Sequence, residues 1–392
     1  MLMTNILHLT FDYPDALRGN TTMAIKRLID CANTFTNNYC ISLHNNFPKR
    51  TITINGDQAH VIVAASGIML GPGFVRFLQL CAQEIQKQKM PWTATDMIHG
   101  HKLVMEGYVA RQLSRALKIP YCVSVRATDF TILKYRPLLK TMAMQILAEA
   151  KKIAIIAPWM LPKLRQCFGA QWYSALEDKI TLLGNVVDGP TYLHEMDNGR
   201  FVMPLNLNRS QLTRKNVFRT LRAIGGTASL GQKAYLDIIG EGSGMSIVRR
   251  WIKRLKLEEQ VTLVGGVPHE EMIGRLAGYK ALILCSYPET FGLVYVEGLR
   301  AGIPLIFSRG CGFDGFFDQY DFGIGVQNGS EDSITQAICT MISRHAVFKH
   351  SVKRLQEARA LDFFSGVQVA ERLRDMYHCG GGASAAGQGE LQ

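Results

Sequence analysis

Two glutamates, Glu289 and Glu297, lie on either side of a Phe-Gly pair in the segment SYPETFGLVYVEGLRAG, residues 286–302. The apolar run KALILC at 280–285 predicts a buried parallel strand just before them. The spacing of apolar residues after Gly292 predicts a helix. We therefore expect Glu289 in a loop at the carboxyl end of a strand, and Glu297 in the helix that follows. In open α/β sheets, ligands bind in the crevice at that edge.

The start of this predicted helix offers a place for an anionic group. The backbone amides of Phe291, Gly292 and Leu293, with the positive end of the helix dipole, would face such a group. Gly292 lets a ligand approach the backbone closely, although it could also be an ordinary turn glycine. In the same way, Glu297 could belong to a solvated helix face and Glu289 could be an ordinary loop carboxylate.

Strand and helix patterns alternate along the whole chain, which is typical of βα units that build parallel sheets. The predicted strands of the first series lie at 5–10, 39–43, 60–64, 96–99, 121–125, 151–156 and 179–182, and its helices at 21–34, 74–87 and 103–117. The second series has strands at 201–207, 235–240, 261–266, 281–285 and 304–308. The Gly-, Asn- and Asp-rich segment 185–200 separates the two series. The predicted fold class is α/β, with two Rossmann-like domains facing a cleft.

Length and composition agree with this prediction. A chain of 392 residues exceeds what one hydrophobic core usually serves, and its hydrophobic content of 47% is that of a well-packed globular protein. No apolar run reaches the length of a membrane span, and the N-terminus does not read as a secretory signal. The nine cysteines form no CxxC pair, which indicates a reducing compartment and argues against a zinc site. We expect a cytoplasmic protein.

The net charge of +12 is concentrated in the first half, where residues 1–190 carry +9. Such a surface could meet nucleic acid, an anionic membrane or an anionic substrate, or could simply be basic. Nucleic acid is disfavoured, because the chain has no zinc-finger spacing, no RNP-like aromatic box and no basic arm. The segment RRWIKRLK at 249–256 could lie on a membrane as a basic amphipathic helix. Its apolar residues fit packing on its own sheet more simply.

Several motifs together resemble glycosyltransferase family 4, a family of sugar-nucleotide enzymes with the two-domain GT-B fold. In the second half these motifs are IGEG at 239–242, VTLVGGV at 261–267 and PETFGLVYVEGLRAGIP at 288–304, in the order and spacing of the family's donor domain. The first half is similar through DMIHGH at 96–101, IPYCVSVRATD at 119–129 and LLGNVVD at 182–188. The resemblance therefore spans nearly the whole chain.

The resemblance also implies what each part of the chain does. It makes residues 1–190 an acceptor-binding Rossmann-like domain and residues 191–360 a nucleotide-sugar-binding one. A C-terminal helix at 361–379 is expected to cross back to the N-terminal domain. The low-complexity residues 380–392 are expected to be a disordered tail.

By the same resemblance, Glu297 binds the ribose hydroxyls of the nucleotide and Glu289 binds hydroxyls of the transferred sugar. Arg209 and Lys215 would hold the diphosphate. Arg214 is an alternative to Lys215, because the family usually spaces its Arg and Lys five residues apart. The remaining donor-binding residues implied in this way are Gly19, Gly240, Val267, Thr290, Phe291, Gly292 and Leu293.

The catalytic residues that the resemblance implies are Glu289, His101 and Arg126. His101 and the acceptor-binding residue His99 end a predicted strand at the cleft, where two histidines could also be structural. Arg126 stands where many relatives have His, and it would act as an electrostatic clamp because Arg does not serve as a base. Asp129 would bind the acceptor or, as an alternative, cap the following helix.

The activity implied is that of a retaining glycosyltransferase in polysaccharide or glycolipid biosynthesis. It would move a sugar from a nucleotide-sugar donor to a saccharide or lipid-linked acceptor, and an anionic membrane surface is a further candidate partner. The chain has no Asp-x-Asp triplet, so we expect no metal and no cofactor besides the nucleotide-sugar co-substrate. Two alternatives remain open: a sugar-nucleotide epimerase of the same fold, and a sugar-nucleotide-binding protein without turnover. 

Overall fold

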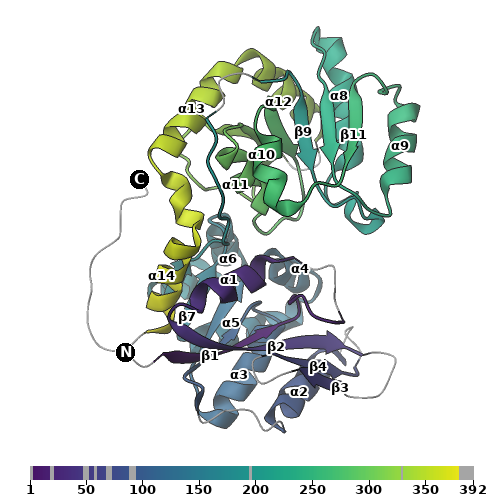
Figure 1. The fold of residues 1–392 in the computed structure, drawn as a ribbon. Coiled ribbons are helices and arrows are strands. Elements are labelled where there is room, and N and C mark those ends of the chain that lie inside the picture. The colour runs from purple at the N-terminus through teal and green to yellow at the C-terminus, as the bar shows by residue number, and fades with distance from the viewer. Residues whose placement is uncertain are drawn as a thin grey trace. The chain divides into compact units, whose positions relative to one another are not determined.

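The computed structural model describes residues 3–17, 22–46, 53–56, 60–67, 73–87, 94–193, 197–327 and 330–378. These residues form two compact units, each built on its own sheet (Figure 1). Unit 1 contains the residues up to 156, those from 160 to 186, and the C-terminal segment from 366. Unit 2 contains residues 157–159 and 187–365. Each unit is described below by itself.

Unit 1 has an eight-stranded sheet in the order β3-β4-β2-β1-β5-β6-β7-β8. All neighbouring pairs are parallel except β3 and β4 at one edge, which are antiparallel. The predicted strands of the first series are confirmed, and the edge strand β3 was not predicted. The strands are β1 (Thr4–Thr10), β2 (Thr36–Asn45), β3 (Thr53–Gly56), β4 (His60–Ala65), β5 (Met97–Gly100), β6 (Tyr121–Val125), β7 (Lys152–Ile155) and β8 (Ile180–Leu182).

Helices cover both faces of this sheet, which is why most residues of its central strands are buried (Figure 1). The C-terminal helix α14 packs beside α1, and α2 packs beside α3. In α1 the buried positions Ala24, Ile25, Leu28, Ile29 and Ala32 form one stripe at helical spacing. The helices are α1 (Ala24–Ala32), α2 (Gly73–Gln86), α3 (Glu106–Leu117), α4 (Ala127–Tyr135), α5 (Lys140–Glu149), α6 (Met160–Phe168), α7 (Ala170–Ser174) and α14 (Gly366–Tyr377).

Unit 2 has a six-stranded parallel sheet in the order β11-β10-β9-β12-β13-β14. The five predicted strands are confirmed, and β14 follows them without having been predicted. The strands are β9 (Phe201–Pro204), β10 (Leu236–Ile239), β11 (Val261–Gly265), β12 (Ala281–Leu284), β13 (Leu305–Ser308) and β14 (Gly323–Val326). The helices are α8 (Val217–Gly226), α9 (Met245–Arg254), α10 (Met272–Leu276), α11 (Leu293–Arg300), α12 (Glu331–Ser343) and α13 (His345–Glu357).

The basic helix α9 buries Val248 and Ile252, so its apolar residues are used in packing on unit 2.

A second packing feature fixes the loop that precedes α11. Phe291 sits among phenylalanines from later parts of the chain, with its ring centroid 6.1 Å from Phe313, 5.6 Å from Phe316 and 5.3 Å from Phe364. These edge-to-face contacts hold the start of α11 against the core.

Close backbone packing joins the turn after β9 to the turn after β10. The amide of Leu207 donates to the Glu241 carbonyl, and the amide of Gly244 donates to the Leu207 carbonyl. Gly240 has a φ of +145°, and a Cβ there would lie 1.8 Å from the Leu205 carbonyl oxygen. Only glycine fits this contact, which fixes both turns at the carboxyl ends of their strands.

We predict that Gly240→Ala lowers the free energy of unfolding by at least about 2 kcal/mol, because the backbone must move to admit the methyl group. Gly231→Ala is the matched control. Gly231 also has a positive φ, +73°, but its added Cβ would meet nothing within 4 Å. The control should therefore cost only about 1 kcal/mol, from the left-handed backbone alone. Urea unfolding of the two variants measures the difference, and equal losses would contradict the steric explanation.

Candidate functional site

The residues predicted for donor binding gather at one edge of the unit 2 sheet. Arg209 follows β9, Gly240 follows β10, Val267 follows β11, and the segment Glu289–Leu293 follows β12. These four strands are parallel neighbours, so their carboxyl ends lie side by side. This is the edge at which open α/β sheets bind ligands.

The loop after β12 is tied to the loop after β9. The amide of Tyr287 donates to the Arg214 carbonyl at 2.8 Å, and Arg214 Nη1 lies 3.5 Å from the Pro288 carbonyl oxygen. The amide of Gly312 donates to the Glu289 carbonyl at 2.9 Å from the other side. Glu289 therefore has a fixed backbone position between two neighbouring loops.

The Glu289 carboxylate is 8% exposed and lies against two cations. Its Oε2 is 2.7 Å from Lys215 Nζ and 4.0 Å from Arg214, and its Oε1 accepts from the Thr290 amide at 3.2 Å. Burial raises the pKa of this carboxyl, but Lys215 and Arg214 lower it by more, so the pKa lies below its usual range. The group is ionised at neutral pH. Both candidate cations reach the site, and Lys215 makes the closer contact.

A cavity of about 650 Å³ adjoins this loop. It carries two guanidinium groups, those of Arg214 and Arg219, and has no carboxylate among its described lining residues. The lining is completed by Ser210, Thr213, Asn216, Tyr287 and Pro288. An open, polar and positively charged hollow of this kind suits an anionic ligand.

The start of α11 is built so that the backbone is accessible. Gly292 is the N-cap with a φ of +77°, and a Cβ at this position would lie 2.4 Å from the Tyr295 ring. Tyr295 is held in place because its hydroxyl donates to the Leu284 carbonyl at the end of β12. Because the N-cap is a glycine, it has no side chain to cap the helix, and the first amides and positive dipole end suit an anionic group.

Glu297 lies in the second turn of α11 and is only 4% exposed. It is therefore not part of a solvated helix face. His269 Nε2 approaches its Oε1 to 3.6 Å from the short 3₁₀ turn after β11. The remaining predicted donor residues surround this edge: Thr290, Leu293, Gly240 and Val267 are half-buried and Arg209 is exposed. Gly19 lies outside the described residues.

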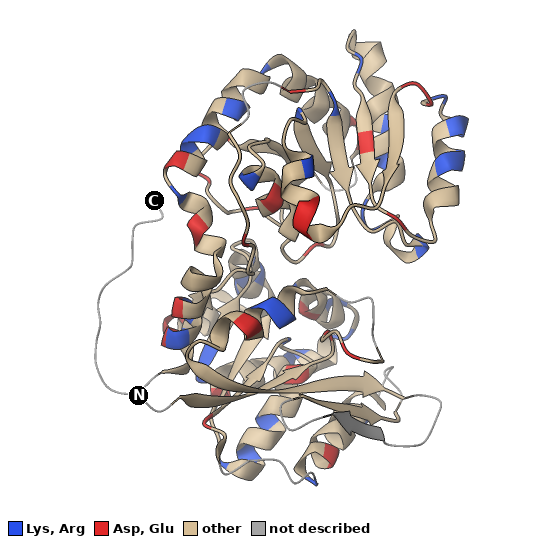
Figure 2. Cartoon of the chain, in the orientation of Figure 1, with Lys and Arg blue, Asp and Glu red and all other residues tan. Residues whose placement is uncertain are grey.

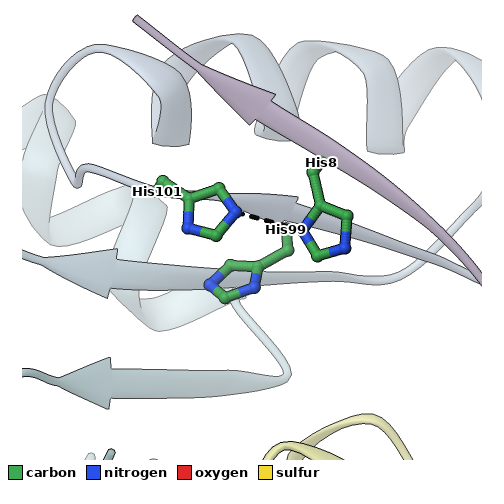
Figure 3. Close-up of side chains that lie close together, drawn as sticks. All are labelled: His8, His99 and His101. Atoms are coloured by element: carbon green, nitrogen blue, oxygen red, sulfur yellow. Dashed lines mark hydrogen bonds between the residues drawn. The ribbon is translucent and has the colours of Figure 1, made fainter. Parts of the chain in front are cut away.

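The predicted residues His99 and His101 of unit 1 are buried, together with His8, which was not predicted (Figure 3). His8 and His99 are register partners on the adjacent strands β1 and β5. His101 lies two residues after His99, directly after the end of β5. The alternation of strand side chains therefore puts all three on one face of the sheet. His8 was not predicted because its own strand gives no sign of a cluster, and only the pairing of β1 with β5 brings it to His99.

These histidines form a hydrogen-bonded cluster. Asn38 Oδ1 is an acceptor, so His8 Nε2 donates to it at 2.9 Å, and His101 Nε2 then donates to the bare Nδ1 of His8 at 3.0 Å. His99 bonds the hydroxyls of Tyr377 and Ser124 at 2.7 and 2.8 Å. Both predicted side chains are fully buried rather than facing a cleft, which supports their structural interpretation.

The cluster is electrically neutral. Burial lowers the pKa of His8 to about 4, and burial with the nearby positive charge of Arg126 lowers the pKa values of His99 and His101 well below the usual range. One nitrogen from each ring lies within 4.8 Å of the others, so the three could approach a metal ion. The Nδ1 of His101 is the one ring nitrogen of the three without a hydrogen-bond partner among the described residues, and Arg126 disfavours added positive charge. The residues therefore fit a hydrogen-bonded core better than a metal site.

Charged residues surround this cluster at the carboxyl ends of β5 and β6. Asp129 accepts from the Arg126 and Val104 amides at 2.8 and 2.9 Å and is fully buried, which supports the alternative that it caps α4. Arg126 Nε donates to the His101 carbonyl at 2.9 Å, and its Nη2 is buried without a partner within the described ranges. Glu106, which was not predicted, is fully buried, and burial raises its pKa to about 7.

We predict that His8 makes the stability of the protein depend on pH. The unfolded imidazole takes up a proton below about pH 6.5, whereas the folded one does so only near pH 4. Wild type should therefore lose stability relative to His8→Gln as the pH falls, by about 2 kcal/mol at pH 5 and about 3 kcal/mol at pH 4. Urea unfolding at each pH measures this difference.

Glu106→Gln is the control with the opposite sign. The raised pKa of Glu106 gives stability below about pH 4.5 that is lost as the pH rises through 7. Relative to this variant, wild type should therefore gain stability as the pH falls from 7 to 5. Parallel curves for wild type and His8→Gln would contradict the neutral histidine cluster.

Comparison with known proteins agrees with this geometry. Residues 205–359 match the family described as glycosyl transferases group 1. The chain is 18% identical to N-acetyl-alpha-D-glucosaminyl L-malate synthase of Bacillus anthracis over 294 residues, which is 72% of this chain and 74% of that protein. It is 30% identical to a peptide N-acetylglucosaminyltransferase GtfA subunit of Streptococcus pneumoniae over 144 residues, which cover 34% of this chain and 25% of the relative.

Solved structures resemble nearly the whole chain. Sucrose-phosphate synthase of Thermosynechococcus elongatus aligns with a TM-score of 0.68 at 15% identity, covering 95% of this chain and 98% of its own. Anabaena HepE in complex with UDP and glucose aligns with a TM-score of 0.64 at 15% identity, covering 94% and 98%. Within the described ranges, no helix has the length and apolar character needed to cross a bilayer. The chain therefore has the GT-B fold, and its residues 205–359 match the glycosyl transferases group 1 family, which confirms the resemblance drawn from its sequence motifs.

Proposed function

We propose that this protein is a retaining glycosyltransferase that moves a sugar from a UDP-sugar to a saccharide or lipid-linked acceptor. The observation that carries the proposal is the convergence of Lys215, Glu289, Glu297 and the uncapped start of α11 at the carboxyl edge of the unit 2 sheet. UDP is favoured because HepE and GtfA, two structural neighbours, were solved with UDP and a sugar. The relative of Bacillus anthracis is likewise named for an N-acetyl-alpha-D-glucosaminyl group.

The proposed donor site separates two kinds of group. The ammonium of Lys215 and the first amides of α11 stabilise the negative charge that grows on the leaving diphosphate, in the place of a metal ion. Arg209 adds a further cation at the same edge. The buried carboxylate of Glu297 accepts hydrogen bonds from the ribose hydroxyls, and Glu289 does the same for the transferred sugar. Because Glu289 is ionised and fixed between two loops, it orients the sugar rather than donating a proton.

In the proposed reaction, the bond between the anomeric carbon and the β-phosphate oxygen breaks, and the acceptor oxygen bonds to the same face of the sugar. The acceptor hydroxyl gives its proton to the departing phosphate oxygen, so no further base is required. On unit 1, Arg126 would assist as an electrostatic contact, since its Nη2 has no partner among the described residues. His99, His101 and Asp129 would stabilise the carboxyl ends of β5 and β6 from inside unit 1. Gly19 would lie next to the phosphates.

Donor binding is tested first by thermal unfolding with UDP-, GDP-, ADP- and dTDP-sugars in EDTA. At a concentration of 100 times Kd, a donor adds about 2.7 kcal/mol and should raise the Tm by several degrees. We expect a shift with UDP-sugars in wild type that is lost in Glu297→Ala. The exposed Glu259→Ala serves as the matched control and should keep the shift. No shift with any nucleotide in wild type would contradict the proposed donor site.

Turnover is tested by acceptor-dependent release of UDP. Lys215→Ala should lower kcat/KM by about 100-fold or more, because a preorganised donor at the leaving phosphate is removed. Lys253→Ala, on the exposed face of α9, should leave kcat/KM unchanged. Epimerised donor without release of UDP would replace the proposal with an epimerase, and donor binding without either product would indicate a binding protein.

A further inference from the structure

A second cavity of unit 2, of about 460 Å³, lies beside α13. Its wall is made by one face of α13, by the connection that enters unit 2, and by the residue that follows α11. The lining residues are Tyr192, Leu193, Gly302, His345, Ala346, Lys349, His350, Lys353 and Gln356. None of the described lining residues is acidic. The cavity therefore has a strongly basic wall beside an apolar one formed by Tyr192, Leu193 and Ala346.

The basic groups come from one face of α13. His345, Lys349 and Lys353 follow each other at intervals of four residues, and this spacing aligns their side chains along the helix. Lys and Arg recur along this helix (Figure 2). The ammonium of Lys349 is shielded from solvent, and it has no hydrogen-bond partner in the part of the chain that the structure describes. A buried cation without a partner is costly, which calls for a group to pair with it.

Among the described residues, one acid acts on this cluster. Asp197 lies 3.3 Å from both Lys280 and His345, and its charge also favours the protonated form of Lys349, against the burial that lowers the pKa of that ammonium. A single carboxylate thus faces several basic groups, and positive charge remains in excess. Lys349 lines the cavity, and its flexible stem allows the ammonium to turn toward a ligand inside. With Lys353 and His350 at the exposed mouth, an incoming anion would meet cations at the entrance and again at depth.

The cavity is separate from the donor site. Gly302, in its wall, lies beyond the carboxyl end of α11, whereas the amides proposed for the diphosphate lie at the amino end of that helix and Glu297 lies in its second turn. Eight helical residues separate the two ends, which corresponds to about 12 Å. The groups that would hold UDP are therefore not the groups that line this cavity.

We propose that the cavity beside α13 is a second binding site, which takes the phosphate group of a phosphorylated molecule. Lysine ammonium groups bind phosphate as mobile point charges, and two lysines, Lys349 and Lys353, line this cavity. The cavity is much larger than a phosphate ion, and its apolar wall accommodates the carbon part of the ligand. The ligand is either a soluble phosphate ester or the head group of an anionic lipid, and both present the same chemistry to Lys349 and Lys353.

Calorimetric titration of the full chain with glycerol 3-phosphate tests the proposal, with glycerol as the neutral control at matched ionic strength. We expect saturable binding to wild type that weakens at least 10-fold in Lys349→Met and in Lys353→Gln. Methionine keeps the unbranched stem of Lys349 and removes the charge, so the fold should persist. Lys233→Met, at an exposed lysine of the same unit, should bind like wild type.

Two further measurements distinguish a soluble phosphate ester from a lipid head group. They also separate a failure of this proposal from a failure of the proposed donor site. The thermal shift with UDP should remain in both variants, which shows that the donor site is intact; absence of a UDP shift in wild type would count against the donor site alone. Flotation with phosphatidate-containing vesicles, but not with pure phosphatidylcholine, would identify a lipid head group if Lys349→Met abolishes it. Binding of glycerol 3-phosphate without flotation would identify a soluble ester. No binding of either, or equal binding by all variants, overturns the site.

Discussion

The buried ion pair between Lys215 and Glu289 joins the loops that follow two adjacent strands, β9 and β12. Each charge has lost most of its water, so each depends on the other, and the removal of one partner of such a pair typically costs 3–5 kcal/mol. The pair holds the Glu289 loop in place just before Gly292, where α11 begins with uncapped amides. A cation, an anion and a helix dipole are thus fixed together at one sheet edge.

The two units treat buried polar groups differently. At the donor edge of unit 2, opposite charges compensate each other, and Glu289 stays ionised. In unit 1, three imidazoles remain neutral and satisfy one another through hydrogen bonds that end at Asn38, Ser124 and Tyr377. A neutral network of this kind stabilises the sheet beneath Arg126 without adding charge to it. Arg126 is buried next to this network, and its Nε donates to the His101 carbonyl.

Much of the fold could be predicted because its signals are local. Runs such as ALIL and LIF are apolar at every position, which is typical of parallel strands covered on both faces, and Gly302 marks the end of α11. The strands β3 and β14 were missed because each is a short edge strand that contains glycine. The sheet edge that carries the proposed donor residues was predictable for the same reason as the strands, since most of these residues lie in loops that follow recognisable apolar runs.

The sequence by itself determined the order of βα units, the position of Glu289 and Glu297 around a strand-to-helix turn, and the excess of basic residues. These follow from spacing along one stretch of chain. Only the tertiary structure decided that His8 joins His99 and His101, that Asp129 caps α4, and that Lys349 lies unpaired beside a cavity. Strand pairing and burial depend on segments far apart in sequence. The pairing of β1 with β5 and the packing of α14 over unit 1 turned two apparent site histidines into parts of the core.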